Sequence, residues 1–252
     1  MTTTYFTSPE GRRLAYRASA PTHSPLTYVW LSGFKSDMSG TKVTELKAWA
    51  TEAGHGFLAF DYSGHGLSDG AFEDGTISAW REDALAAIDT HSTGPIVLVG
   101  SSMGGWMALL AALARPDRVA GLVLIAPAPD FTEKLMWPEF SAEAQSEIME
   151  QGFTQRPSDY DEPYTITRAL IEDGQTWQIL DAPIELDIPV RILQGMQDAD
   201  VPWKHAERLV DTITSEDLVF TLIKDGDHRL SREQDIARLK TTCAEIATAT
   251  RP

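Results

Sequence analysis

A serine set between glycines is the clearest chemical signal in the sequence. Residues 100–104 read Gly-Ser-Ser-Met-Gly, which matches the pattern G-x-S-x-G with Ser102 at its centre. In this pattern the serine lies on a tight turn from a strand into a helix, and the two glycines remove Cβ atoms that would clash there. A strand-like run at 96–99 precedes the motif, and a helix-compatible run follows it to about residue 115. The pattern predicts Ser102 as an exposed nucleophile and gives no role to Ser101.

A serine hydroxyl becomes a good nucleophile only when a base removes its proton. The chain order in this kind of site is serine, then acid, then histidine, which leaves His205 and His228 as possible bases. His228 follows the last predicted strand and should lie on a loop at the carboxyl edge of the sheet. His205 falls inside a predicted amphipathic helix and is expected at the surface. We therefore expect His228 to be the base, and a turn role for His65.

The base needs a carboxylate that orients the imidazole and stabilises its charged form. Two candidates, Asp198 and Asp200, follow the predicted strand at 190–193. Asp200 is well placed to cap the next helix, which begins near Val201-Pro202. Asp198 precedes that helix, and we expect it to be the acid.

Backbone N–H groups should stabilise the oxyanion that forms when the serine attacks a carbonyl. Met103 directly follows the nucleophile, and Phe34 follows the predicted strand at 28–31, so these two residues are the expected donors. Trp106 and Trp137 are candidates for lining an acyl or aryl pocket.

Apolar runs that alternate with amphipathic segments must position these residues. Such alternation is typical of an α/β protein with a mostly parallel sheet covered by helices on both faces. About eight strands are expected, of which the first two form an antiparallel hairpin at the sheet edge. The predicted strands are 3–6, 14–18, 28–31, 57–60, 96–99, 119–125, 190–193 and 218–223. The predicted helices include 41–53, one around 80–88, one that follows Ser102, one around 206–213, and a last one that Ser231 and Gln234 open as a capping box.

The alternation stops between residues 128 and 185, a segment that contains no convincing strand. It carries 13 acidic and 3 basic residues, so ten of the sixteen net negative charges lie there. A connection this long inside one domain indicates a functional insertion. We expect a helical cap at 128–185 on a core formed by residues 1–127 and 186–252.

Composition narrows the function further. The 252 residues carry a net charge of −16, which disfavours nucleic acids and anionic bilayers as partners. A small-molecule or acylated substrate is the expected partner, because the predicted serine nucleophile attacks a carbonyl group. No apolar run approaches the roughly 18 residues that a membrane span needs. A single cysteine, Cys243, can form neither an intrachain disulfide nor a cysteine-based zinc site. The first residues show no targeting pattern, which predicts a cytoplasmic location.

Taken together, these motifs resemble the α/β-hydrolase superfamily, and they stand in its order along nearly the whole chain. The matching stretches are Leu31-Ser-Gly-Phe34, Asp61-Tyr-Ser-Gly-His-Gly-Leu-Ser-Asp69, Gly100-Ser-Ser-Met-Gly-Gly-Trp106, Gly195-Met-Gln-Asp198, Val201-Pro-Trp203 and Asp227-His228. A closer resemblance is to the animal mitochondrial palmitoyl-protein thioesterase group that also cleaves acyl-glucuronides, including that of mycophenolic acid. The stretches that carry it are Ser39-Gly-Thr-Lys42, Phe60-Asp-Tyr-Ser-Gly64, Gly104-Gly-Trp106, Ala114-Arg-Pro116, Val201-Pro-Trp203 and Asp227-His-Arg229. The resemblance implies a serine hydrolase of acyl esters or thioesters that uses no metal or organic cofactor, and the missing transit peptide points to a bacterial relative.

Other functions remain open at this stage. C–C bond hydrolases and cofactor-free peroxidases of the same fold also keep the serine. A non-catalytic ligand-binding protein, or an interaction protein that uses the acidic cap, is less favoured. Dehalogenases and epoxide hydrolases place an aspartate where this chain has Ser102. The resemblance therefore supports the mechanism more strongly than the substrate.

Overall fold

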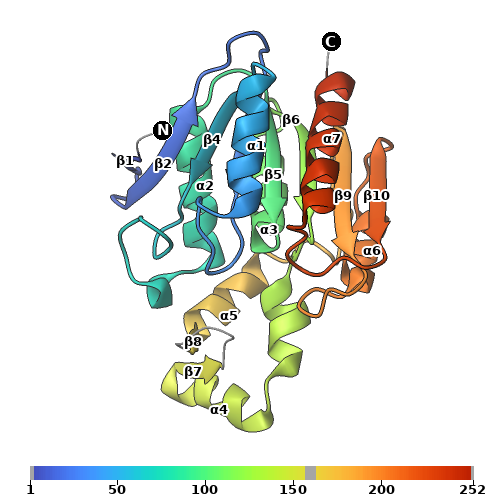
Figure 1. Ribbon diagram of the computed structural model, residues 1–252. Helices are drawn as coiled ribbons and strands as arrows, with labels where there is room; N and C mark the ends of the chain where they lie inside the picture. The colour runs from blue at the N-terminus through green and yellow to red at the C-terminus, as the bar shows by residue number, and fades with distance from the viewer. Residues whose placement is uncertain (1–2, 157–162, 251–252) are drawn as a thin grey trace.

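An eight-stranded sheet lies at the centre of the computed structural model (Figure 1), which describes residues 3–156 and 163–250. Its strand order is β1-β2-β4-β3-β5-β6-β9-β10. The six strands from β4 to β10 are mutually parallel, and β1 and β2 form the expected antiparallel hairpin at one edge. The strands are β1 Thr4–Thr7, β2 Arg13–Ser19, β3 Thr27–Leu31, β4 Gly56–Phe60, β5 Ile96–Ser101, β6 Val119–Ile125, β9 Val190–Gly195 and β10 Leu218–Ile223. The structure confirms the predicted α/β class with a mostly parallel sheet.

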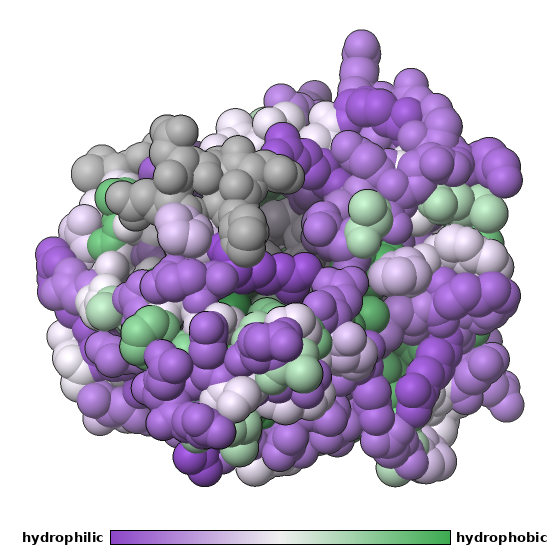
Figure 2. Space-filling model, turned by 90° about the horizontal axis from the view of Figure 1, so that it is seen from below, coloured by the Kyte–Doolittle hydropathy of each residue, from purple (hydrophilic) through white to green (hydrophobic). Residues whose placement is uncertain are grey.

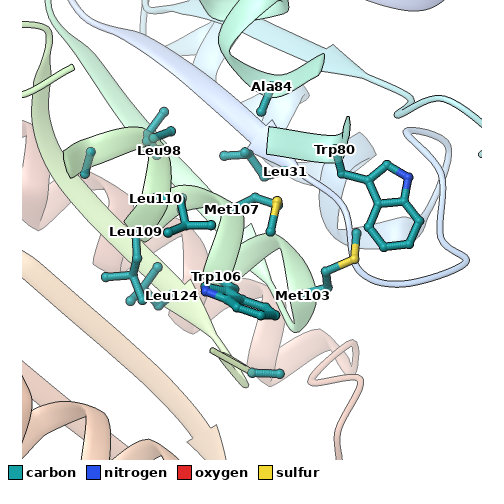
Figure 3. Close-up of a cluster of buried hydrophobic side chains, with 14 of the residues drawn as sticks. Leu31, Trp80, Ala84, Leu98, Met103, Trp106, Met107, Leu109, Leu110 and Leu124 are labelled. Atoms are coloured by element: carbon teal, nitrogen blue, oxygen red, sulfur yellow. The ribbon is translucent and has the colours of Figure 1, made fainter. Parts of the chain in front are cut away.

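Helices cover both faces of this sheet. One face carries α1 (Thr41–Glu52) and α7 (Glu233–Ala249), whose buried side chains form one hydrophobic cluster with the strands. The other face carries α2 (Ile77–His91), α3 (Met103–Ala114) and α6 (Trp203–Thr212), which form a second cluster. Figure 3 shows part of the second cluster, where α3 side chains meet those of the central strands and of α2. Because α3 is buried almost all round, the turn that begins it is held rigidly at the carboxyl edge of β5.

The segment between β6 and β9 projects from the carboxyl edge of the sheet (Figure 1). It consists of a π-helical turn at Thr132–Met136, a 3-10 turn at Trp137–Glu139, α4 (Ala142–Gln151), β7 (Phe153–Arg156), β8 (Tyr164–Thr167) and α5 (Arg168–Thr176). The expectation that it holds no strand is wrong, because β7 and β8 pair in an antiparallel sheet of their own. Its outer surface is mostly hydrophilic, as Figure 2 shows from below and as its acidic composition requires.

Hydrogen bonds fix this segment to the core. Asp173 of α5 accepts from the backbone N–H of Ser78 at 2.7 Å and from its hydroxyl at 2.6 Å. The indole N–H of Trp177 donates to the same hydroxyl at 2.7 Å. At the start of the segment, the buried Asp130 carboxylate accepts from the backbone N–H groups of Ile179 and Leu180, so the two ends of the segment are joined.

Two expected helix starts differ from the structure. Arg232, rather than Ser231, caps α7, and Asp235 takes the part expected for Gln234. The reason is electrostatic, because the Arg232 guanidinium binds the Asp235 carboxylate at 2.8 Å. Helix α6 begins at Trp203 after Pro202, so Asp200 is not its cap.

None of the described helices is both long and apolar enough to cross a bilayer.

Candidate active site

Ser102 lies on a strained turn between β5 and α3. Its φ of 56° and ψ of −120° are unusual for a residue other than glycine. A Cβ on Gly100 would overlap the carbonyl oxygen of Gly104, and a Cβ on Gly104 would overlap the carbonyl oxygen of Leu31. The Ser102 N–H donates to the Ile125 carbonyl at 2.9 Å, which ties the turn to the neighbouring strand. The glycines of the motif therefore have the steric role that the sequence predicts.

This close packing predicts a large loss of stability for Gly104→Ala. The added methyl group meets backbone atoms of β3, which cannot move without disturbing the sheet, so we expect a loss of about 3 kcal/mol in the free energy of unfolding. Gly40→Ala is the matched control, because a Cβ at Gly40 has no neighbour within 4 Å and its φ is −63°. We expect the control to stay within about 1 kcal/mol of the wild type in urea unfolding. Equal stability of the two variants would contradict the packing argument.

His228 bridges Ser102 and Asp198. Its Nε2 lies 3.2 Å from the Ser102 Oγ, and its Nδ1 lies 2.8 Å from the Asp198 Oδ2. Since a carboxylate only accepts hydrogen bonds, Nδ1 carries the proton and Nε2 is free to accept one from the serine. Three residues from different loops at one sheet edge are thus joined in one hydrogen-bonded chain, as the sequence predicts.

The Asp198 carboxylate is held from several sides. Its side chain is fully buried, and it accepts from the backbone N–H groups of Val201 at 2.8 Å and Asp200 at 3.0 Å. The Gln194 side-chain amide donates to it at 3.0 Å. Asp200 is exposed and contributes its backbone to this arrangement. The structure therefore favours Asp198 over Asp200 as the partner of His228.

His205 does not belong to this chain of hydrogen bonds. It is buried rather than at the surface as expected, and its ring Nε2 lies 2.7 Å from the Pro129 carbonyl oxygen. Burial lowers the pKa of His205, so the ring is neutral at pH 7 and donates this bond. His205 ties α6 to the start of the segment between β6 and β9.

A cavity of about 450 Å³ opens above Ser102. Its walls come from the loop after β3, the start of α3, the segment between β6 and β9, and the loops that carry Asp198 and His228. The lining residues are Gly33, Phe34, Lys35, Ser36, Lys42, Ser101, Ser102, Met103, Ala128, Phe131, Leu135, Met136, Glu139, Arg156, Tyr164, Ile166, Ala199, Asp200, Val201, His228 and Arg229. Ser102 and His228 therefore meet a space large enough for a small acylated molecule.

Both expected oxyanion donors line this cavity. Met103 is the first residue of α3, so its N–H has no acceptor within the helix. Phe34 belongs to a tight turn in which the Ser36 N–H donates to the Gly33 carbonyl at 3.1 Å. A Cβ on Gly33 would lie 3.3 Å from the Ser102 Cβ, which shows how closely this turn passes the serine.

The two tryptophans expected in the pocket lie elsewhere. Trp106 is fully buried, its indole N–H donates to the Trp177 carbonyl at 3.3 Å, and its ring packs edge-on against Phe131, which separates it from the cavity. Trp137 packs against Phe140 with ring centroids 6.3 Å apart and does not line the cavity. Both assignments are corrected, because each ring packs against another aromatic ring and neither lines the cavity.

Other apolar residues form that wall, and sequence analysis missed them. Leu135 and Met136 come from the π-helical turn, and Tyr164 and Ile166 come from β8. The alternating sequence Tyr-Thr-Ile-Thr at 164–167 was the available signal, because β-branched and aromatic residues favour strands.

The polar part of the cavity is basic, in contrast to the acidic chain as a whole. Its lining holds the cations Lys35, Lys42, Arg156 and Arg229 against the two carboxylates Glu139 and Asp200. The Lys42 ammonium donates to the Arg229 carbonyl, and desolvation lowers its pKa to about 8. The Arg156 guanidinium is paired with Glu139 at 2.7 Å. The cavity thus combines an apolar wall with a positively charged one.

One group of described side chains has the spacing of metal ligands. Asp198, Asp200 and His228 offer ligand atoms that all lie within 4.8 Å of one another. Two of them already belong to the chain of hydrogen bonds that ends at Ser102. Backbone N–H groups bind the Asp198 Oδ1, and His228 and the Gln194 amide bind its Oδ2. We therefore assign this group to that chain rather than to a metal centre.

The chain is similar to known hydrolases in both sequence and fold. A model of the alpha/beta hydrolase family matches residues 24–240. The mitochondrial palmitoyl-protein thioesterase ABHD10 of Bos taurus is 37% identical over 220 residues, which cover 86% of this chain and 72% of that protein. The crystal structure of a candidate hydrolase from Agrobacterium vitis S4 has a TM-score of 0.94 and 44% identity over 98% of each chain. Mouse alpha/beta hydrolase domain-containing protein 10 has a TM-score of 0.89 and 34% identity, covering 98% of this chain and 99% of its own.

Proposed function

The chain belongs to the alpha/beta hydrolase family as an ester or thioester hydrolase, and we propose that it works through an acyl-enzyme formed on Ser102. The observation that carries this proposal is the contact of Ser102 with a histidine that a buried carboxylate orients. The Oγ of Ser102 lies 3.2 Å from the His228 Nε2 beside a cavity of about 450 Å³. This is the arrangement that nucleophilic catalysis by serine needs.

In the first half of the reaction His228 accepts the Ser102 proton while Oγ attacks the carbonyl carbon. The oxygen of the tetrahedral intermediate accepts hydrogen bonds from the Phe34 and Met103 N–H groups. Asp198 stabilises the charged imidazole. The C–O or C–S bond then breaks, and His228 returns its proton to the alcohol or thiol that leaves.

In the second half water attacks the ester that the acyl group has formed with Ser102. His228 takes a proton from this water, and the same two N–H groups stabilise the second oxyanion. Collapse of the intermediate releases the carboxylic acid and returns the proton to Ser102. Both halves use the same three side chains, so one geometry serves the whole cycle.

The cavity walls suggest how a substrate lies. We assign the acyl chain to the apolar wall formed by residues such as Phe131, Leu135 and Ile166, and the leaving group to the basic side near Lys42 and Arg229. The segment 128–185 then acts as a cap that selects the acyl group, since it supplies most of the apolar wall. The ABHD10 relatives are mitochondrial proteins by name, so the expected cytoplasmic location of this chain stays a prediction.

A panel of matched substrates tests this proposal. Esters, thioesters and acyl-glucuronides with acyl groups from acetyl to palmitoyl are ranked by kcat/KM. The proposal expects hydrolysis of esters or thioesters with a clear optimum of chain length. Absence of turnover across the panel, together with cleavage of a C–C bond in a diketone substrate, would favour the C–C hydrolase function instead.

Narrowing the apolar wall should change this optimum. Leu135 is half-buried and lines the cavity, so Leu135→Trp fills part of the space without entering the main core. We expect kcat/KM for octanoyl or longer esters to fall at least about tenfold, while that for acetyl esters changes little, because only long chains lose contact area. Leu113→Trp, on the exposed side of α3, is the matched control. A uniform loss across all chain lengths would contradict the assignment of this wall to the acyl group.

A further inference from the structure

We propose that His65 is a positioning residue, which fixes the peptide that directly follows the oxyanion donor Phe34. The inference rests on the proposed function, because it explains how one half of the oxyanion hole is held in place. It assigns to His65 a role beyond the turn that the sequence analysis gave it.

Two hydrogen bonds define the His65 ring. Its Nε2 lies 3.1 Å from the backbone N of Lys35, whose N–H donates to it. Its Nδ1 lies 3.1 Å from the Ser63 carbonyl oxygen, which can only accept. The ring is therefore neutral, with its proton on Nδ1, and it connects the turn after β4 to the turn after β3.

The bond to Lys35 acts where the backbone is strained. Lys35 has a φ of 54°, in the left-handed region that residues with a Cβ rarely occupy. Such a conformation persists only where neighbouring structure holds it. Because the Lys35 N–H belongs to the same peptide plane as the Phe34 carbonyl, its direction restricts the rotation of Phe34 and the direction of the Phe34 N–H.

The surroundings of His65 keep the ring in its acceptor state. It is 4% exposed and packs edge-on against Tyr62, Phe72 and Trp80, with ring centroids 5.7, 5.3 and 5.1 Å away. Burial, helped by the nearby Lys35 charge, lowers the pKa of His65 to about 4. A protonated ring would present a donor to the Lys35 N–H, and this environment disfavours it.

A second contact shows that the turn after β4 serves as a support for the turn after β3. Asp61 accepts from the backbone N–H of Met38 at 2.7 Å and from that of Leu67 at 2.9 Å. A Cβ on Gly66 would overlap the Asp61 carboxylate, so the glycine makes room for this bond. Asp61 thus holds the far end of the loop, and His65 holds the part next to Phe34.

Two variants of His65 and one neighbouring variant test the proposal. His65→Leu keeps much of the volume but removes the acceptor, and we expect kcat to fall about 10- to 100-fold with KM within about threefold. His65→Gln places an amide oxygen near the position of Nε2, and we expect it to recover most of kcat. Tyr62→Phe changes a ring that packs against His65, but its hydroxyl has no hydrogen-bond partner among the described residues, so we expect wild-type kcat.

The pH dependence of kcat/KM separates positioning from a general disturbance of the site. None of the described hydrogen bonds or ring contacts of His65 involves His228. The acid limb of the plot of kcat/KM against pH should therefore keep its midpoint in His65→Leu. Equal losses in His65→Leu and His65→Gln would show that His65 only fills space, and a wild-type kcat in His65→Leu would also overturn the proposal. Failure of the proposed function is a different result, in which the Ser102→Ala variant keeps the activity of the wild type.

A measurement on the wild-type protein covers the case in which His65→Leu does not fold. In ¹⁵N-histidine NMR at pH 7, the proposal expects His65 with a proton on Nδ1 and none on Nε2. A proton on the His65 Nε2 would exclude the bond from Lys35 and overturn the proposal whatever the variants show.

Discussion

Replacing the proposed nucleophile, in Ser102→Ala, is expected to lower kcat/KM for an activated ester by about 10⁴- to 10⁶-fold. The variant loses the oxygen that would form the proposed acyl-enzyme, while the Phe34 and Met103 N–H groups and the cavity remain. The remaining rate should therefore be that of water attacking a bound ester. Steady-state kinetics on p-nitrophenyl esters measure the loss.

The fold should survive this change. The Ser102 hydroxyl contacts the His228 ring, whereas the turn itself is held by backbone bonds such as that from the Ser102 N–H to Ile125. The unfolding midpoint in urea should stay close to that of the wild type. Ser101→Ala is the matched control at the neighbouring residue and should keep kcat within about fivefold. A Ser102→Ala variant that keeps more than about a hundredth of the wild-type rate would contradict the assignment.

Removing the negative charge of the proposed triad acid, in Asp198→Asn, is expected to lower kcat by about 10³- to 10⁴-fold. An amide has one acceptor oxygen where the carboxylate accepts from His228, Gln194 and two backbone N–H groups. The His228 ring can then carry its proton on Nε2, where it faces the serine as a donor and no longer as a base. The charged imidazole also loses the carboxylate that stabilises it.

Asp200→Asn is the matched control, because it makes the same chemical change two residues away. Its side chain is exposed, and its backbone N–H, which supports Asp198, is unaffected. We expect kcat within about threefold of the wild type. A greater loss in Asp200→Asn than in Asp198→Asn would reverse the choice between the two carboxylates.

The parts of the site that lie directly on the sheet were predictable from sequence. Continuous apolar runs between amphipathic segments predicted the parallel strands, and the carboxyl ends of parallel strands meet at one edge of the sheet. This geometry places the loops of Ser102, Asp198 and His228 together although 126 residues separate the first from the last. At residues 100–104 the G-x-S-x-G motif also stands between a predicted strand and a predicted helix, which is the context that the nucleophile turn requires.

The walls of the cavity were less predictable. Strands β7 and β8 have four residues each, and β8 buries only Ile166 fully, so their pattern is too short to separate from a loop.

The direction of a helical side chain caused a second error, the prediction that Trp106 lines the cavity. Met103 and Trp106 are one turn apart on α3, but Met103 lines the cavity and Trp106 lies behind Phe131.

The role of the turn after β4 could not be predicted from sequence, because its hydrogen bonds join residues far apart in the chain. In sequence, His65 resembles the other turn residues of a stretch rich in glycine, because its hydrogen bond to Lys35 spans 30 residues.

The same stretch also contains a second G-x-S-x-G pattern at residues 66–70. There the Ser68 hydroxyl donates to the Asp61 carbonyl at 2.6 Å and accepts from the Ala15 N–H at 2.8 Å, so it serves the backbone.

Labelling with a fluorophosphonate, followed by mass spectrometry of the peptides, tests the central claim most directly. The reagent forms a stable adduct with a serine that a neighbouring base activates. We predict one adduct per chain, on the peptide that contains Ser102, together with complete loss of esterase activity and no adduct in Ser102→Ala. An adduct on Ser68 or on any other residue, or full activity in a protein labelled at Ser102, would contradict the account.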